Sequence, residues 1–331
     1  MKIPWKAARF VLLAVILLLT PLVAAKKTRK ESSFPVKTEE YEKVLTLWHI
    51  DTFEGGAGAR SDFLNSRAIE FGEKGVLIMV ISHTPESAET ALSTGATPAM
   101  ISFGTGLDFV APRVKSLVKK SFFTSEIKGK TYAYPWCKGG YFLLRKNGDN
   151  RPINKLIVSD GKRNLALGAA YFLNENYDEI ILKEPPEACA DLISAGDGTA
   201  LIGTQRDIKR LITRGLNYTA TPLEEYNDLY QYIAVTADEE AACAVARKFI
   251  DYLLTKKSQE KLSSYGMMPV TNGVSVCESL SAYDGAKTIA GVSAFTSQNS
   301  LENLKNALSE SLKSRKKCQT FENALKRPPN A

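Results

Sequence analysis

The stretch that decides the fold runs from Val44 to Ala59, VLTLWHIDTFEGGAGA. Its first part, Val44–Ile50, is β-branched, aromatic and apolar, as in a buried strand, and the glycines that follow are typical of a turn. In residues 60–73, apolar side chains recur at the i, i+4 and i+7 spacing of an amphipathic helix: Leu64, Ala68 and Phe71. The predicted order is therefore strand, glycine loop, helix.

The same order recurs further along the chain. Residues 76–81, VLIMVI, are a continuous apolar run typical of a strand covered on both faces, and residues 85–93 predict a short helix. MISF, residues 100–103, predicts a third strand. Alternating strands and helices are typical of a parallel α/β sheet, whose ligands lie beyond the carboxyl ends of the strands. We therefore expect ligand-binding side chains within residues 49–58, 83–85 and 103–108.

A second α/β set follows an irregular stretch. Aromatic residues, Pro135 and Gly139–Gly140 interrupt residues 130–145, KTYAYPWCKGGYFLLR, which we expect to be too irregular for a central strand. The second set has predicted strands at 155–159, 179–182 and 200–203 and predicted helices at 164–173 and 187–193. Residues 230–236 are extended again, and Thr236 and Glu239 have the spacing of a capping box before another helix.

The first 25 residues have the layout of a secretory signal, with three basic residues before an unbroken apolar run at 10–19. The run is shorter than the roughly 20 residues that span a bilayer. We therefore expect cleavage after Ala25, with an uncleaved anchor as the alternative, and a linker over residues 26–43. The prediction is an exported protein, in the periplasm or at the extracellular face of the cytoplasmic membrane.

The net charge of +7 does not indicate a nucleic-acid binder, because of where the charge lies. The predicted leader carries +3 and residues 301–331 carry +4, so the rest of the chain is neutral. A neutral body lacks the continuous basic surface that tracks phosphates, and we predict no nucleic-acid partner. The length of 331 residues predicts two domains, at roughly 100–200 residues each.

Residues that carry chemistry are few. The chain has two histidines, and His49 with Asp51 forms an H-x-D pattern that could supply two metal ligands. No further His, Cys or Asp cluster lies near them in sequence, which favours a polar strand end. The five cysteines lack zinc spacing, and Gly104-x-Gly106 lacks the third glycine of a dinucleotide site. The glycine loop at 55–58 could hold an anion or simply permit a turn. We predict no cofactor, no metal and no enzymatic activity.

The order of the pieces resembles the extracellular solute-binding proteins of bacterial ABC importers, of the type II periplasmic-binding fold that includes the maltose-binding protein. Four stretches carry the resemblance: LWHIDTFEGGAGARSDFLNSRAIEF (47–71), ATPAMISFG (96–104), KGKTYAYPWCKGGYFLLRKN (128–147), and ALIGTQRDIKRL (200–211) with LYQYIAV to MMPV (229–270). Ala99 stands where the family usually has Asp, and no Cys ends the leader for lipid attachment.

The resemblance implies two Rossmann-like α/β lobes, joined by crossing hinge strands, that close over a ligand. Lobe one is expected at 44–134 plus 234–275, and lobe two at 135–233 plus 276–331. The implied partners are a small-molecule solute, with carbohydrate the leading class, and the permease subunits of an ABC transporter, and the protein is expected to be a monomer. The alternatives are an anion, polyamine or peptide ligand, a sensor or orphan binding protein, or a secreted hydrolase, for which no motif is present.

Candidate ligand-binding residues lie at strand ends and crossings, where the cleft is expected. Sugar sites combine aromatic platforms with carboxylates, amides and Arg that bind the hydroxyl groups. We expect Trp136 and Phe53 to stack on the ligand. The full candidate set is His49, Asp51, Phe53, Glu54, Phe103, Trp136, Lys138, Gln205, Arg206 and Gln231.

Overall fold

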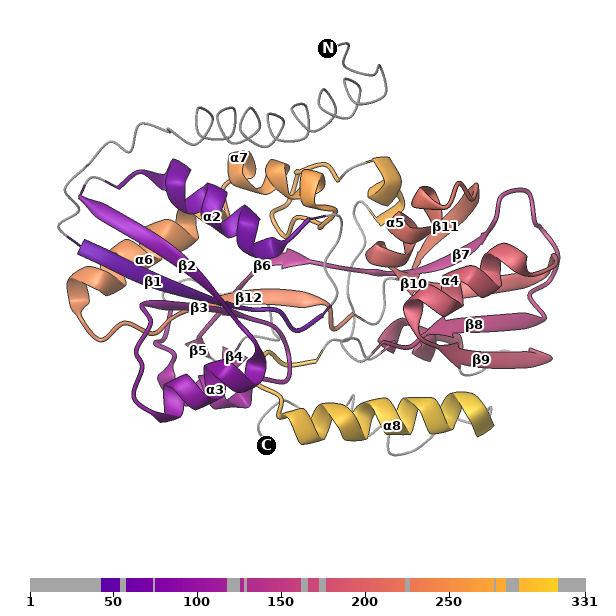
Figure 1. Cartoon of the computed structure of the whole chain (residues 1–331), viewed down its shortest axis with the longest axis horizontal. Helices are drawn as coiled ribbons and strands as arrows, with labels where there is room; N and C mark the ends of the chain where they lie inside the picture. The colour runs from indigo at the N-terminus through magenta and orange to yellow at the C-terminus, as the bar shows by residue number, and fades with distance from the viewer. Residues whose placement is uncertain are drawn as a thin grey trace, which may run out of the picture. The chain divides into compact units, whose positions relative to one another are not determined.

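In the described part of the chain, two five-stranded sheets organise the molecule (Figure 1). The first has the strand order β2-β1-β3-β12-β6 and the second β11-β7-β10-β8-β9. We call each sheet with its helices a lobe. The computed structural model describes residues 43–53, 58–73, 75–117, 126–127, 130–161, 166–172, 177–223, 227–276, 278–283 and 292–314.

The first sheet contains parallel and antiparallel pairs. Strand β1 (Lys43–Ile50) pairs in parallel with β2 (Val76–His83) and β3 (Met100–Phe103), whereas β12 (Tyr230–Val235) pairs antiparallel with both β3 and β6 (Tyr134–Lys138). Its helices are α2 (Arg60–Phe71), α3 (Pro85–Ser93) and α6 (Glu240–Leu253). Side chains alternate along β1, so Leu45 and Leu47 pack in the core with α2 and α6. Trp48 and Ile50 pack in a separate core with α3.

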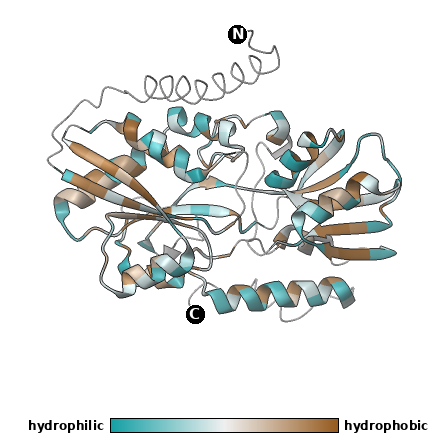
Figure 2. Cartoon of the chain, in the orientation of Figure 1, coloured by the Kyte–Doolittle hydropathy of each residue, from teal (hydrophilic) through white to brown (hydrophobic). Residues whose placement is uncertain are grey.

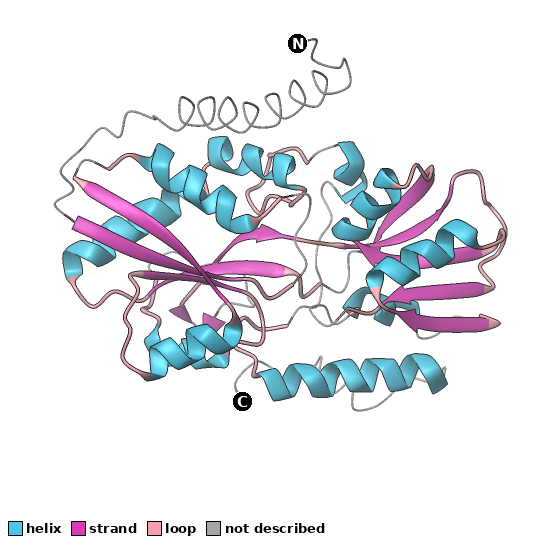
Figure 3. Cartoon of the chain, in the orientation of Figure 1, coloured by secondary structure: helices cyan, strands magenta, loops and turns pink. Residues whose placement is uncertain are grey.

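The second sheet has the same mixture of parallel and antiparallel pairs. Its strands are β7 (Tyr141–Lys146), β8 (Lys155–Ser159), β9 (Glu179–Lys183), β10 (Thr199–Thr204) and β11 (Tyr218–Leu223), with helices α4 (Pro185–Ser194), α5 (Gln205–Thr213) and η3 (Leu167–Phe172). The remaining elements are η1 (Asp108–Arg113), β4 (Glu126–Ile127), β5 (Lys130–Thr131), α7 (Lys256–Gln259), η4 (Glu260–Tyr265), η5 (Glu278–Tyr283) and α8 (Gln298–Ser314). Figure 2 shows hydrophobic residues concentrated on the strands, and Figure 3 shows the helices around both sheets.

The predicted α/β fold class with two lobes is confirmed, and the predicted strand at 155–159 coincides with β8. The expectation that residues 130–145 hold no central strand is wrong for β7, which pairs with β10 on one side and β11 on the other. The stretch looks irregular because Gly139–Gly140 separates two regular strands that belong to different sheets.

The predicted capping box of α6 is also wrong. Helix α6 begins at Glu240, and its N-cap residue Glu239 makes no side-chain capping hydrogen bond. The hydroxyl of Thr236 instead donates to the carbonyl of Pro98 at 2.7 Å, and the Thr236 backbone N–H donates to the carbonyl of Ala99 at 3.0 Å. Thr236 therefore ties the end of β12 to the start of β3 rather than capping a helix.

The chain passes between the sheets at residues 139–140, after β6, and again between β11 and β12. Strands β6 and β12 both pair within the first sheet, so these crossings lie a few residues from the predicted boundaries at 134 and 233. The full division of the chain into lobe ranges stays a prediction. The predicted leader and most of the predicted linker lie outside the described residues. Among the helices that are described, none is both long and apolar enough to cross a membrane.

Candidate functional site

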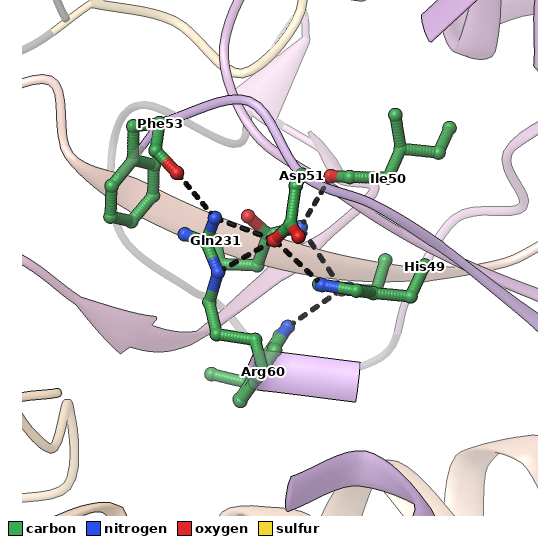
Figure 4. Close-up of polar contacts among 8 residues, drawn as sticks. His49, Ile50, Asp51, Phe53, Arg60 and Gln231 are labelled. Carbon is green, nitrogen blue, oxygen red and sulfur yellow. Dashed lines mark hydrogen bonds and ion pairs between the residues drawn. The ribbon is translucent and has the colours of Figure 1, made fainter. Parts of the chain in front are cut away.

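Polar side chains meet at the carboxyl end of β1, where we expected ligand contacts. Asp51 follows the last residue of β1, and its Oδ1 lies 2.9 Å from Nε2 of His49. Arg60, the first residue of α2, approaches the same oxygen with Nη2 at 2.6 Å and Nε at 2.9 Å (Figure 4). The strand end and the helix start are therefore joined through one carboxylate.

Arg60 is a buried cation, with only 2% of its surface exposed. Its Nη2 donates to the carbonyl of Phe53 at 2.5 Å, and its guanidinium carbon lies 4.1 Å from the centre of the Phe53 ring. A buried charge is tolerated only when it is paired and hydrogen-bonded. Asp51 supplies the counter-charge, so the pair is neutral as a whole.

Burial is the largest single influence on the pKa values of His49 and Asp51. Burial lowers the pKa of His49, and its hydrogen bond with Asp51 opposes that effect without cancelling it. Burial alone would raise the pKa of Asp51, but the hydrogen bond with His49 and the charge of Arg60 hold that pKa well below its usual range. Near neutral pH the cluster therefore contains ionised Asp51, charged Arg60 and a neutral imidazole at His49.

The hydroxyl of Ser102 on β3 connects this cluster to the rest of the first sheet. Its Oγ lies 3.0 Å from Nδ1 of His49 and accepts from Nε1 of Trp136 at 2.9 Å. It also accepts from Nε2 of Gln231 on β12 at 3.2 Å, and the same amide nitrogen donates to the carbonyl of Ile50 at 3.0 Å. Side chains from four strands are thus held in one hydrogen-bonded group.

Three buried polar atoms around the end of β1 have no hydrogen-bond partner among the described residues: Thr52 Oγ1, Arg60 Nη1 and Gln231 Oε1. All the described residues together contain eight such side-chain atoms, and three of the eight lie at this one site. Thr52 lies close against Gly104, where an added Cβ would come 1.6 Å from Thr52 Oγ1. The site therefore has one donor, one acceptor and one hydroxyl that no described residue pairs.

The predicted aromatic residues all lie in the interior. Trp136 is fully buried, and its ring stacks on Phe63 with centroids 5.4 Å apart and an angle of 5°. Phe103 packs against Tyr232 at 6.0 Å between centroids, and Phe53 is buried under Arg60. The structure thus places Trp136 beneath the polar cluster, where its indole N–H donates a hydrogen bond to Ser102 Oγ.

A second group of predicted residues lies at the crossing between the sheets. Gln205 is buried, and its side-chain Oε1 accepts from the backbone N–H of Gly140 at 3.0 Å. The backbone N–H of Gln205 donates to the Gly140 carbonyl at 3.2 Å. Arg206, half-buried, donates its backbone N–H to Thr204 Oγ1 at 3.2 Å. Lys138, also half-buried, exchanges two backbone hydrogen bonds with Met268.

Nine of the ten candidates therefore lie in one of two places. His49, Asp51, Phe53, Phe103, Trp136 and Gln231 surround the end of β1, whereas Lys138, Gln205 and Arg206 lie at the crossing. Glu54 lies outside the described residues. Ser102 and Thr52 were missed, although a serine inside the apolar strand MISF is a signal that could have found Ser102. In the described ranges, no three His, Cys, Asp or Glu side chains are arranged to hold a metal ion.

Comparison with known proteins agrees with this architecture. Residues 145–268 match the model of a family described as bacterial extracellular solute-binding protein. No curated protein sequence matches the chain. Among solved structures, the maltodextrin-binding protein MalE1 from L. casei BL23 has a TM-score of 0.59 at 12% identity, covering 87% of this chain and 99% of that one.

Two further solved structures show the same fold. The bacterial solute receptor AcbH, described as preferring β-D-galactopyranose, has a TM-score of 0.58 at 11% identity and covers 87% of this chain and 98% of its own. A Trichodesmium protein in complex with iron and citrate has a TM-score of 0.55 at 11% identity, covering 85% of this chain and 99% of that one. The chain has the type II periplasmic-binding fold, and the predicted resemblance to extracellular solute-binding proteins is confirmed.

Proposed function

We propose that this chain is the solute-capturing component of an ABC importer and that its solute is a carbohydrate. In this proposal, the exported protein closes its lobes over the solute and delivers it to the permease subunits in the membrane. The family match and the fold support capture of a solute. They leave the class of solute open, because proteins of this fold include one bound to maltose and one bound to iron with citrate.

The unpaired polar atoms at the end of β1 carry the choice of solute class. Arg60 Nη1 needs an acceptor and Gln231 Oε1 needs a donor, and both are buried. A sugar hydroxyl both donates and accepts, so neighbouring hydroxyls can pair with both atoms and with Thr52 Oγ1. Leaving such atoms unpaired costs about 1–3 kcal/mol each, which gives a hydroxyl-rich ligand its advantage.

The charges of the site argue against the alternative ligands. A simple oxyanion would suit Arg60 but would leave Gln231 Oε1 unpaired and would meet the ionised Asp51 carboxylate. A polyamine would suit Asp51 but would meet the buried Arg60 charge. Because Asp51 and Arg60 neutralise each other, a neutral polyhydroxy solute fits this site better than an ion of either sign.

We assign direct contact with the solute to Asp51, Thr52, Arg60 and Gln231. His49 and Trp136 position the cluster from behind, since their side-chain nitrogens are already hydrogen-bonded to Ser102 and Asp51. Lys138 and Arg206 are proposed as the polar contacts that the crossing supplies when the lobes close, because both side chains are half-buried.

The proposal predicts that sugars stabilise the protein and that other solutes do not. Thermal unfolding of residues 26–331 is measured against panels of sugars, amino acids, polyamines and phosphate esters. A sugar present at a hundred times its dissociation constant should add about 2.7 kcal/mol to the free energy of unfolding. Stabilisation by phosphate esters or polyamines alone would show that the solute class is wrong. If no compound shifts the transition, the solute-capture proposal itself fails.

Two variants at one position tie the sugar to the site. Thr52→Ala deletes the hydroxyl, and Thr52→Ser keeps it while losing the same methyl group. Because Thr52 Oγ1 is buried and has no hydrogen-bond partner among the described residues, we expect Thr52→Ala to be at least as stable as Thr52→Ser without sugar. With the active sugar, Thr52→Ala should bind about threefold to tenfold more weakly than Thr52→Ser, as the loss of one hydrogen bond requires.

A further inference from the structure

Helix α8 (Gln298–Ser314) is an amphipathic helix near the C-terminal end of the described chain, drawn in yellow in Figure 1. Its buried apolar residues follow helical spacing: Leu301, Leu304, Ala307, Leu308 and Leu312. The other side chains are mostly polar, as the teal colour along the helix in Figure 2 shows. The helix therefore packs against the rest of the protein through its apolar face and leaves its polar face outward.

The start of α8 contacts the first lobe. Just before the helix, Phe295 is buried in the core of that lobe, with its ring 5.7 Å from the ring of Phe103. In the first turn of α8, Leu301 and Gln298 lie against Gly106, in the loop that follows β3. A Cβ added to Gly106 would come 2.6 Å from Leu301 Cδ1 and 3.1 Å from Gln298 Oε1. Gly106 also has φ +93, so glycine is required there on both grounds.

The next turn of α8 contacts the second lobe. Nζ of Lys305 donates to the carbonyl of Gly161 at 3.0 Å and lies 2.9 Å from Oδ1 of Asp160. Both residues follow β8 directly. Further along, the helix contacts η3 and β9 of the same lobe.

Both contacted loops lie at the ligand edge of their sheet. Gly106 lies just beyond the carboxyl end of β3, and Asp160 and Gly161 lie at the carboxyl end of β8. Ligands of open α/β sheets bind beyond these strand ends, so one helix joins the two surfaces between which a solute is captured. The lobes cannot separate widely at these edges while Leu301 stays on Gly106 and Lys305 stays on Asp160.

We propose that α8 is a strap that holds the two ligand edges together when no solute is bound. The strap has a packing contact at the first lobe, Leu301 on Gly106, and an ion-pair contact at the second, Lys305 on Asp160. Releasing either contact shifts the population toward a more open form, because the two states differ by those contacts. The meaning of this opening for solute entry rests on the proposed function, but the strap itself does not.

The test measures the distance between the lobes in the absence of any solute. Spin labels are attached through introduced non-natural amino acids at Glu89 on α3 and Ala190 on α4, both exposed, so that all five cysteines stay in place. We expect one narrow distance distribution for the unmodified chain. Leu301→Ala removes the contact with the first lobe, and Lys305→Met removes the ion pair with the second lobe. Each variant should raise the population at longer distance severalfold.

Two control variants separate the strap from general loosening. Leu211→Ala removes a fully buried leucine of α5 that packs in a cluster of the second lobe containing no residue of α8. Lys155→Met removes an ion pair to Glu179 that lies wholly within the second sheet. Both should keep the narrow distribution. The proposal is overturned if Leu301→Ala and Lys305→Met leave the distribution unchanged, or if the controls broaden it equally. Because no sugar is used, this outcome is independent of the solute panel.

Discussion

Asp51 is the residue on which the charge balance at the end of β1 depends. Its carboxylate accepts from Arg60 and is hydrogen-bonded to His49, and it is the only one of these three side chains with substantial exposure, at 44%. Removing its charge leaves the buried guanidinium of Arg60 without a counter-charge among the described residues. The stability of the site is thus set by a carboxylate that water also reaches.

We predict that Asp51→Asn destabilises the fold at neutral pH and that the difference disappears in acid. The loss should be about 1–2 kcal/mol, below the 3–5 kcal/mol of a fully buried pair, because water screens the half-exposed carboxylate. The pKa of Asp51 is lower in the folded state than the unfolded value of about 3.9. Its contribution is therefore fully present above about pH 4 and declines as the pH falls through the folded value.

Urea unfolding of the unmodified chain and of Asp51→Asn, at pH 7 and at successively lower pH, checks this prediction. Asp62→Asn, an exposed substitution in the first turn of the same helix, is the matched control and should change little at any pH. A difference between the unmodified chain and Asp51→Asn that stays constant down to pH 3 would contradict the assigned role of the charge.

At this scale, sequence reasoning found the site only in part. The H-x-D pattern predicts that His49 and Asp51 lie together at a strand end, because strand geometry fixes them. Arg60 and Ser102 join them through the fold, since α2 and β3 bring distant segments to the same edge. Alternation along a strand gives the face of an aromatic side chain but not its depth, which is why the burial of Trp136 could not be predicted.

Among the elements, the two crossings between the sheets are held by side chains that bind backbone. Asn227, fully buried, donates from Nδ2 to the carbonyl of Gly139 and accepts from the N–H of Leu229, both at 2.9 Å. The N–H of Gly139 donates to the Leu229 carbonyl at 2.7 Å. The Tyr141 hydroxyl donates to Asp228 at 2.8 Å. The crossings therefore form one hydrogen-bonded unit.

We predict that Gly139→Ala destabilises the chain by about 1–3 kcal/mol, as overpacking of a closed site does. The new Cβ would lie 2.6 Å from Oε1 of Gln205, whose side chain is held in place by its bond to Gly140. Adding Gln205→Ala to this variant should recover part of the loss, because it removes the clash. Gly196→Ala is the control, since nothing lies within 4 Å of its new Cβ. Double-mutant analysis of thermal unfolding measures the coupling, and strict additivity would contradict the contact.

Element prediction succeeded where one pattern decides the structure. Continuous apolar runs located β2 and β8, and β8 is buried from Leu156 to Ser159 as such a run predicts. The expectation that β2 is covered on both faces is wrong, because β2 lies at the edge of the first sheet and Met79 is 44% exposed. Element prediction failed for β7, where glycines that end one strand and begin another resemble an irregular loop. Strand β11 was not predicted, since Tyr218–Leu223 contains Pro222 and few strongly apolar residues, and only Leu223 in it is buried.

At the scale of the whole molecule, the core does not stop at the crossings. One cluster of buried side chains includes Leu45 and Phe249 of the first lobe together with Leu156 and Ile202 of the second, and Leu308 of α8. By their contacts, Lys43–Ala331 group as one compact unit. Trp136 and Tyr141, on either side of Gly139–Gly140, belong to this same cluster. The two sheets therefore share buried area that neither would keep alone.

We therefore predict that the two lobes unfold together, although chains with two lobes often unfold in steps. Trp48 and Trp136 both lie in the first sheet, and they are the only tryptophans within residues 26–331, so fluorescence reports on lobe one. Hydrogen exchange of the β8 amides reports on lobe two. Both probes should give the same urea midpoint, and Gly139→Ala should lower both by the same amount, because it acts at the shared crossing. Separate midpoints, or a shift confined to fluorescence, would mean that the continuous core does not couple the lobes.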